Sequence, residues 1–287
     1  MLISRLPDDW RERRLVVPFL GAGNFYGGVG SAMLPRPLLA DYTRPLVLAH
    51  RAIKGSPERL AEQVRKMPVS RPQFMATRRR LSKVVKSAAH PGNKYTVGAD
   101  FLYLMRTGFN GLWRCSQKGG VNTSWGKPTP DFEVWSPHVS ETVWAWHALL
   151  KRTDAILRCQ DFRATLKQAL AFTEPLLIFA DPPYWPLQLP GLGTPGLLES
   201  VPEYRDSWDD YTPIGFSARD HADLLALLAE HLRRGAFILS TNHHHAAWEA
   251  RYQAEGFGVK HFDNRRNGNS DASKRGAVKE VLFIGRP

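Results

Sequence analysis

The chain has few cysteines and no long hydrophobic run, and both shortages restrict its possible classes. Its 287 residues contain two cysteines, Cys115 and Cys159. Two isolated thiols provide neither a disulfide framework nor the spacing of a cysteine zinc site, so we expect a reducing compartment. No apolar stretch approaches the roughly 20 residues of a membrane-spanning helix, and residues 1–10 lack the apolar core of a signal peptide. We therefore expect a cytoplasmic protein with no membrane partner.

Acidic residues are scarce in one central segment. Residues 51–130 contain 16 Lys or Arg against 3 Asp or Glu, a net charge of +13, whereas the whole chain carries +12. The other 207 residues therefore sum to −1. A basic surface can simply aid solubility, but positive charge confined to one region is typical of a surface that binds a polyanion, above all nucleic acid.

One motif, Asp181-Pro182-Pro183-Tyr184, carries the most chemical information. It follows the apolar run 175–180, which predicts a buried parallel strand, and ligands bind where such strands end. The prolines lack backbone donors and leave a rigid carbonyl free to accept hydrogen bonds. Carboxylate, carbonyl and aromatic ring together suit a planar amino group and the ring that carries it. A turn without function is the alternative, since Asp and Pro are common turn residues.

A second candidate site follows the first predicted strand, residues 14–20. Gly21-Ala22-Gly23 comes directly after it, and a short strand at 37–40 ends at Asp41. Glycines after a strand bring backbone N–H groups close to a ligand, and an acid at the end of the second strand can bind the two hydroxyls of a ribose. The pattern therefore predicts a nucleoside-binding edge of an α/β sheet.

The rest of the chain alternates helical patterns and strands. Residues 44–53, 57–66, 78–89 and 139–158 have helical patterns, and 100–107 looks like the start of another helix. Between 109 and 127, aromatic residues interleave with cations, as on many nucleic-acid surfaces. The Gly/Pro-rich stretch 185–212 predicts a functional loop, and Ser217 with Asp220 predicts a capping box for a helix at 219–233. Strands are expected at 236–239 and 278–284.

The run His243-His244-His245 also invites a metal interpretation. Adjacent side chains project in different directions, however, so these three imidazoles should not share an ion. We predict no metal site and no metal partner for the protein.

Five stretches, in this order, resemble the Dam-type DNA adenine-N6 methyltransferases (D12 class, alpha group). They are Phe19-Leu-Gly21-Ala-Gly23 with Asp41, residues 101–126, Cys159-Gln-Asp161-Phe162, Asp181–Tyr184, and Ser240-Thr-Asn242-His243 with residues 278–282. The family usually begins with a Trp-Ala-Gly-Gly-Lys-like segment that helps to bind the cofactor, and none precedes Phe19 here. Val17 also stands where the family often has Glu. Either the true start of the chain lies upstream, or this is a divergent, phage- or prophage-derived member. For a chain that is complete as given, we expect the free cofactor to bind weakly and to bind more tightly once DNA closes the loop at 185–212.

The resemblance implies a Rossmann-like, S-adenosylmethionine-dependent methyltransferase sheet with an inserted, mainly helical DNA-recognition domain. The catalytic domain would comprise residues 1–48 and 156–287, and the recognition domain residues 49–155. The residues that it implies for binding S-adenosylmethionine are Phe19, Gly21, Ala22, Gly23, Asp41, Asp161, Phe162 and Asp181.

The activity implied is site-specific methylation of adenine N6 in double-stranded DNA, with the base flipped into a pocket. Asp181 and the Pro182 carbonyl would accept hydrogen bonds from N6. Tyr184 would stack on the base together with an aromatic residue from the following loop, for which Trp185 is one candidate. Phe109 and Asn110 would fill the gap that the base leaves, Leu112 and Arg114 would contact base edges, and Lys83, Lys86 and Lys118 would bind DNA through their charge.

We expect a monomer or weak dimer. The alternatives are methylation of cytosine N4, RNA or a protein amide, and a catalytically silent DNA-binding homologue.

Overall fold

A mostly parallel sheet forms the centre of the fold. The computed structural model describes residues 2–32, 34–87, 92–116, 118–129, 131–185, 215–265 and 277–287. Within these ranges, seven strands pair in the order β3-β2-β1-β4-β5-β7-β6. Their bounds are β1 Arg14–Val17, β2 Leu38–Asp41, β3 Ile156–Cys159, β4 Leu176–Ala180, β5 Phe237–His243, β6 Gly258–Arg265 and β7 Ala277–Gly285. Neighbours from β3 to β5 are parallel, and β7 is antiparallel to both β5 and β6. The predicted α/β, Rossmann-like class is confirmed.

The strand order reverses between β1 and β4. From β1 the chain adds β2 and β3 on one side, and later β4 and β5 on the other. In open parallel sheets, ligands bind in the crevice beyond the carboxyl ends of the strands at such a reversal. The segments that follow β1 and β4 are the glycine turn at residue 21 and the motif that begins at Asp181. The topology therefore brings the two candidate sites of the sequence to one edge of the sheet.

Alternate residues of the central strands enter two separate cores. Val16 and Ile178 pack in the core that includes α7 Phe162–Ala169 and α8 Ala218–Arg233, whereas Leu15 and Leu177 face the opposite core. In the latter, Phe25 of α1 Asn24–Val29 stacks on Phe179 of β4 at 4.1 Å between ring centroids. Burial on both faces explains why these strands are continuous apolar runs rather than alternating ones.

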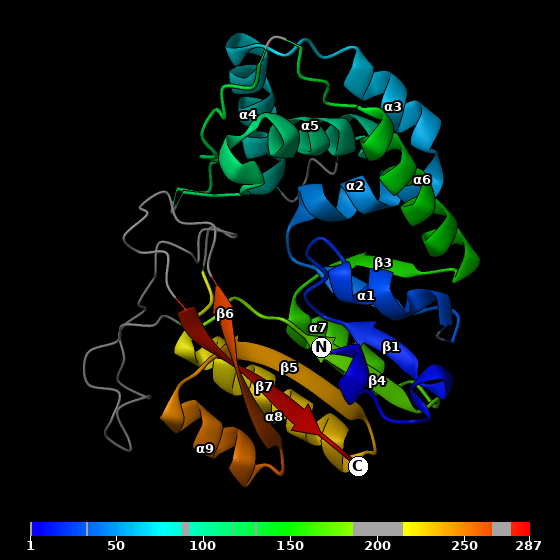
Figure 1. Cartoon of the computed structure of the whole chain (residues 1–287), viewed down its shortest axis with the longest axis vertical. Coiled ribbons are helices and arrows are strands. Elements are labelled where there is room, and N and C mark those ends of the chain that lie inside the picture. Colours follow the sequence, from blue (N-terminus) through cyan, green and yellow to red (C-terminus); the bar gives the residue numbers. More distant parts are fainter. Residues whose placement is uncertain are drawn as a thin grey trace.

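Helices α2 to α6 gather beyond one face of the sheet, on the side of α1 (Figure 1). Their bounds are α2 Arg44–Gly55, α3 Pro57–Arg65, α4 Arg71–Lys86, α5 Lys94–Thr107 and α6 Pro137–Arg152. Four of them begin at a polar cap whose side chain accepts a hydrogen bond from the first turn, and these caps are Ser56, Ser70, Asn93 and Ser136. Arg80 of α4 contacts buried Asp100 of α5 through two hydrogen bonds of 2.8 and 2.5 Å. This two-point contact joins the two helices.

Three helix boundaries differ from those that the sequence predicted. The helix predicted at 139–158 is wrong at its end, because α6 stops at Arg152 and Ile156–Cys159 is strand β3. Asp154, at φ 47°, reverses the chain between them without a glycine or proline to mark the turn. Helix α4 begins at Arg71 rather than 78, behind the Ser70 cap, and residues 100–107 are the end of α5 rather than its start. The capping box of Ser217 and Asp220 on α8 is confirmed.

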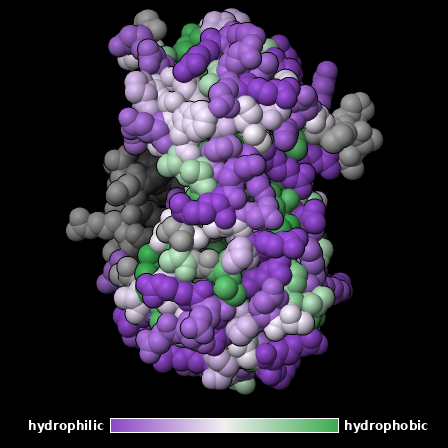
Figure 2. Space-filling model, turned by 90° about the vertical axis from the view of Figure 1, so that its right-hand side faces the viewer, coloured by the Kyte–Doolittle hydropathy of each residue, from purple (hydrophilic) through white to green (hydrophobic). Residues whose placement is uncertain are grey.

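The described part of the chain contains no helix long and apolar enough to cross a membrane. The face in Figure 2 is mainly hydrophilic, and hydrophobic residues form only scattered patches on it. Of the predicted loop at 185–212, only Trp185 belongs to the described residues. Helix α9 Ala246–Ala254 packs beside β6 at the end of the sheet opposite β3 (Figure 1).

Candidate active site

Asp181 lies directly beyond β4 and is held by the neighbouring strand. The Oγ1 atom of Thr241, on β5, donates a hydrogen bond of 2.5 Å to Asp181 Oδ1. Burial raises the pKa of the Asp181 carboxyl above its usual value, although hydrogen bonds from Thr241 and Tyr184 act in the opposite direction. The group is thus an acceptor with a defined orientation in a poorly hydrated place.

The next residues of the motif are held by β5 as well. Asn242 Oδ1 accepts hydrogen bonds from the backbone N–H groups of Trp185 and His243, each at 2.8 Å. His243 Nδ1 donates to the Trp185 carbonyl at 2.5 Å, because a carbonyl can only accept. The His243 ring also packs edge-on against Tyr184, 4.8 Å between centroids. Consecutive residues of β5 therefore set the path of the chain through the motif.

Tyr184 keeps its phenolic proton in this setting. Burial raises the pKa of the Tyr184 hydroxyl, and the negative charge of Asp181 raises it further. A neutral phenol can donate a hydrogen bond to the carboxylate beside it.

The suggestion that Trp185 stacks on a substrate ring is wrong. Trp185 is only 4% exposed. Its ring packs against His221 at 5.0 Å and Trp248 at 5.3 Å, in the core beneath the motif. The aromatic ring next to Tyr184 in sequence therefore anchors the motif and does not face a ligand. This role could not be predicted from the sequence, since a tryptophan after a proline turn fits either role.

The two glycines of the turn after β1 are required for different reasons. Gly21 has φ +51°, and a Cβ on it would meet no atom within 4 Å, so open space lies against its backbone. Gly23 has φ +84°, and a Cβ there would come within 2.6 Å of the Trp146 ring on α6. Left-handed backbone favours glycine at both positions. The first glycine leaves room for a ligand, and the second allows close packing against α6.

The Asp41 carboxylate organises the same turn. Its Oδ2 accepts a hydrogen bond of 2.9 Å from Gly21 N, and its Oδ1 accepts one of 2.8 Å from Thr43 N. Each carboxylate oxygen has a further lone pair, so both can still accept from a ligand hydroxyl. Tyr42 beside it is 50% exposed, an aromatic residue at this edge that the sequence reasoning did not single out.

Phe19 and the segment after β3 complete this edge of the sheet. Phe19 stacks on Phe162 at 5.4 Å between centroids, and Phe216 contacts both rings. Asp161 is the N-cap of α7, where its Oδ1 accepts from Arg163 N at 2.8 Å. Phe162 itself is buried, so most of its ring serves packing.

Residues 108–116 and 118–126 pair as an antiparallel ribbon at the end of α5. Bridges join Gly108 to Trp125 and Cys115 to Val121. Phe109 at its start is 45% exposed, and Asn110 has a left-handed backbone, φ 52°. Among the other residues predicted to contact DNA, Arg114 and Lys118 are exposed and Leu112 is half-buried.

Helix α4 holds this ribbon through hydrogen bonds. Ser82 Oγ accepts a hydrogen bond of 2.9 Å from Val121 N, and Arg78 donates one of 3.2 Å to the Thr123 carbonyl. Lys83 and Lys86 are exposed on the same helix. Arg78 and Arg80, two of the cations in the basic stretch, are thus partly engaged within the protein.

A family model, that of the D12 class N6 adenine-specific DNA methyltransferases, matches residues 1–189, more than half of the chain. The chain belongs to this family. The predicted resemblance is confirmed, and with it adenine N6 in DNA as the target of the family's chemistry.

Relatives with related names align over nearly the whole chain. The DNA N-6-adenine-methyltransferase of Escherichia phage P1 is 28% identical over 276 residues, which cover 95% of this chain and 32% of that protein. The DNA adenine methylase of Vibrio cholerae is 24% identical, covering 96% of this chain and 88% of the relative. The DNA adenine methylase of Escherichia coli K12 is 22% identical, and the alignment covers 95% of this chain and 86% of that protein. The chain thus spans about a third of the phage P1 protein but most of the two bacterial ones.

Two residues, neither of them predicted from the sequence to belong to the site, link the helices of the methyltransferase to the glycine turn. Trp146 Nε1 donates a hydrogen bond of 2.9 Å to His50 Nδ1, and His50 Nε2 lies 3.0 Å from the Gly21 carbonyl. An indole N–H can only donate, so the proton of the neutral imidazole is on Nε2 and is donated to Gly21. Burial lowers the pKa of His50 and keeps it neutral, against the opposing effects of the Gly21 hydrogen bond and the Asp41 charge. Nothing in the sequence indicated a contact between residues so far apart.

Proposed function

We propose that the protein transfers a methyl group from S-adenosylmethionine to N6 of one adenine within a specific sequence of duplex DNA, after that base has left the helix. The observation that carries this proposal is the position of Asp181 and Tyr184. They follow β4, which pairs with β1 at the strand-order reversal, and Thr241 orients the carboxylate.

The residues beyond β1 and β2 fit S-adenosylmethionine as the methyl donor. The open space at Gly21 admits a ligand against the backbone, and Asp41 offers oxygens for ribose hydroxyls. Tyr42 is an exposed ring at the same edge, where a nucleoside base could stack. When bound, this donor supplies a methyl group on a positively charged sulfur.

The protein's own groups would orient the acceptor nitrogen. Asp181 and the Pro182 carbonyl accept the hydrogen bonds of the two N6 protons, which favours a nitrogen whose lone pair is directed at the methyl group. Tyr184 stacks on the flipped base and fixes its plane. Holding the two reacting atoms in line accounts for much of the acceleration, since positioned reactants avoid the entropic cost of encounter. Asp181 needs no strong basicity, because the methylated amine loses its proton readily.

We also propose that residues 49–155 recognise the DNA and that residues 1–48 and 156–287 carry the catalysis. The exposed Phe109 and Asn110 at the start of the ribbon would occupy the gap left by the base. Arg114 and Leu112 would contact base edges, and Lys83, Lys86 and Lys118 would contact phosphates. Such an enzyme would work as a monomer or weak dimer where bacterial or phage DNA is kept, in the cytoplasm.

The test is to identify the methylated base. Duplex DNA from a methylation-deficient host is incubated with the protein and S-adenosylmethionine labelled in its methyl group, then hydrolysed to nucleosides. We expect the label in N6-methyl-2′-deoxyadenosine from duplex DNA alone. Label in N4-methylcytosine, in RNA or in added protein would support one of the alternatives, and no label in any substrate would indicate a silent homologue.

A further inference from the structure

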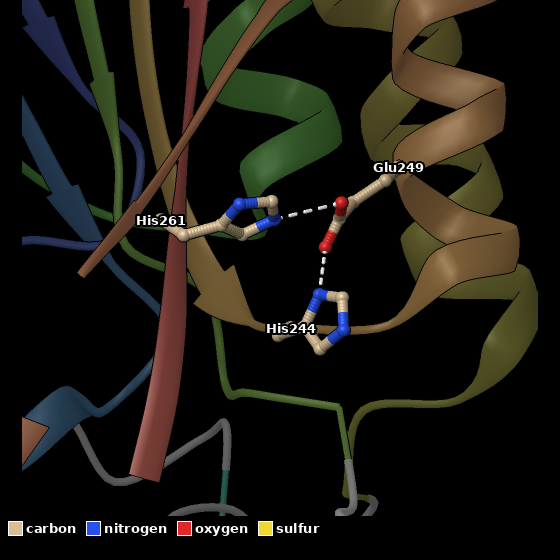
Figure 3. A group of neighbouring side chains, drawn as sticks. All are labelled: His244, Glu249 and His261. Carbon is tan, nitrogen blue, oxygen red and sulfur yellow. Dashed lines mark hydrogen bonds and ion pairs between the residues drawn. The ribbon is translucent and has the colours of Figure 1, made fainter. Parts of the chain in front are cut away.

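Three side chains with metal-binding atoms converge away from the methyl-transfer site. His244 follows β5, Glu249 belongs to α9, and His261 belongs to β6. In Figure 3 both imidazoles point toward the two oxygens of the one carboxylate. Glu249 Oε1 contacts His244 Nδ1, and Glu249 Oε2 lies 2.9 Å from His261 Nε2. Within the described ranges, it is the one group of at least three such residues whose ligand atoms all lie within 4.8 Å of one another.

The histidine run contributes only one member to this group. His243 points toward the Trp185 carbonyl, whereas His244 points toward Glu249. That divergence agrees with the expectation that the three adjacent histidines do not share an ion. The group was invisible in the sequence because its other members come from a helix and from a strand that was not predicted.

We propose that His244, Glu249 and His261 form a binding site for Zn²⁺. Two imidazole nitrogens and one carboxylate oxygen are a common ligand set for zinc, with water in the remaining position. Zinc ligands at about 2.0–2.1 Å in tetrahedral geometry stand about 3.4 Å apart. The present separations, up to 4.8 Å, require only a small inward rotation of side chains.

The surroundings permit that rotation and balance the charge. The side chains of His244 and His261 are 42% and 51% exposed, so both rings can turn, while that of Glu249, at 11%, is held in place. A surface cavity of about 250 Å³ adjoins both imidazoles and gives an ion a path from solvent. Asp263 and Lys279 also line this cavity, and their opposite charges offset each other. The site therefore presents one net negative charge, that of Glu249, to a cation.

A bound ion would join three elements at the outer edge of the sheet. It would hold α9 to β6 and both to the end of β5, the strand whose preceding residues orient Asp181 and Trp185. The effect expected is on stability, because an ion that binds only the folded chain shifts the folding equilibrium by mass action. Zinc binding at this place is independent of methyl transfer.

The experiment measures zinc binding directly. Untagged protein, stripped with a chelator and dialysed, is titrated with Zn²⁺ in a calorimeter. We expect one ion per chain. His261→Gln and Glu249→Gln should each weaken binding about a hundredfold or more, because even changes outside the ligand shell weaken metal sites about 10- to 100-fold. His138→Gln, at an exposed position on α6, is the matched control and should bind as the unchanged protein does.

Two further measurements keep the outcome decisive. Thermal unfolding in chelator shows whether each variant folds, and His244→Gln, at the partly exposed ring, replaces any variant that does not. X-ray absorption of the zinc-loaded protein should show nitrogen and oxygen neighbours that include two imidazoles. Absence of saturable binding, equal binding by all variants, or sulfur neighbours from Cys115 or Cys159 would each overturn the proposal. None of these measurements uses DNA or a methyl donor. A negative result for zinc would therefore leave the proposed methyltransferase activity unaffected.

Discussion

Asp181 is oriented by a residue on the next strand rather than by its own turn. The Thr241 hydroxyl donates to it, and burial raises the pKa of the carboxyl. The acceptor role requires the ionised form. Activity should therefore fall on acidification as pH drops through the pKa of Asp181, at a higher pH than an ordinary aspartate would give.

Replacement of Thr241 tests this dependence. Thr241→Val removes a hydrogen bond that favours the carboxylate, so the pKa of Asp181 should rise further. We expect the acidic limb of the pH profile of single-turnover methylation to move to higher pH. Thr241→Ser keeps the hydroxyl and should restore the original limb. Superimposable profiles for all three proteins would show that Thr241 has no such role.

Trp146 and His50 connect helices α6 and α2 to the glycine turn through two successive hydrogen bonds. Trp146→Phe removes the N–H that fixes the protonation of His50, and it leaves space over Gly23. We expect the affinity for S-adenosylmethionine to fall about two- to tenfold, the range for loss of one hydrogen bond, with DNA affinity retained. Calorimetric titration measures both. Trp144→Phe, at an exposed ring of the same helix, should change neither, and an equal loss in both variants would contradict the linkage.

Helix α4 combines two tasks on one element. Its residues Arg78 and Ser82 hold the ribbon, while Lys83 and Lys86 are exposed. This division explains how a helix within a strongly basic segment can have both an internal and an external role. The charge pattern of the sequence alone did not separate them.

The exposed pair should contribute to the salt dependence of DNA binding. Replacing Lys83 and Lys86 together by Gln should flatten the slope of log affinity against log salt concentration by about one to two units, since each phosphate contact contributes about 0.9. Lys167→Gln with Lys260→Gln changes the charge equally at exposed positions on α7 and β6 and should leave the slope unchanged. Equal slopes for all three proteins would mean that the α4 lysines face solvent without touching DNA.

For the molecule as a whole, the sequence predicted those strands and sites that are determined by neighbouring residues along the chain. The continuous apolar runs before Gly21 and Asp181 located two strands, and their carboxyl ends meet at the strand-order reversal. What depends on packing between distant segments was not predictable. The helical pattern of residues 139–158 does not reveal strand β3, because Asp154 turns the chain without a marker residue. The contact of Trp146 with His50 and the grouping of Glu249 with two histidines exist only once the helices and strands are assembled.

In the proposed reaction, Asp181 contacts the amino group that receives the methyl. The most direct measurement compares the unchanged protein with Asp181→Ala in two assays on the same duplex, single-turnover methylation and equilibrium DNA binding. Loss of a positioned group at a reacting centre costs about a hundredfold or more in rate, whereas phosphate contacts elsewhere hold the duplex. We expect methylation to fall by at least about that factor with DNA affinity nearly unchanged. A methylation rate close to that of the unchanged protein would show that Asp181 does not contact the reacting amino group.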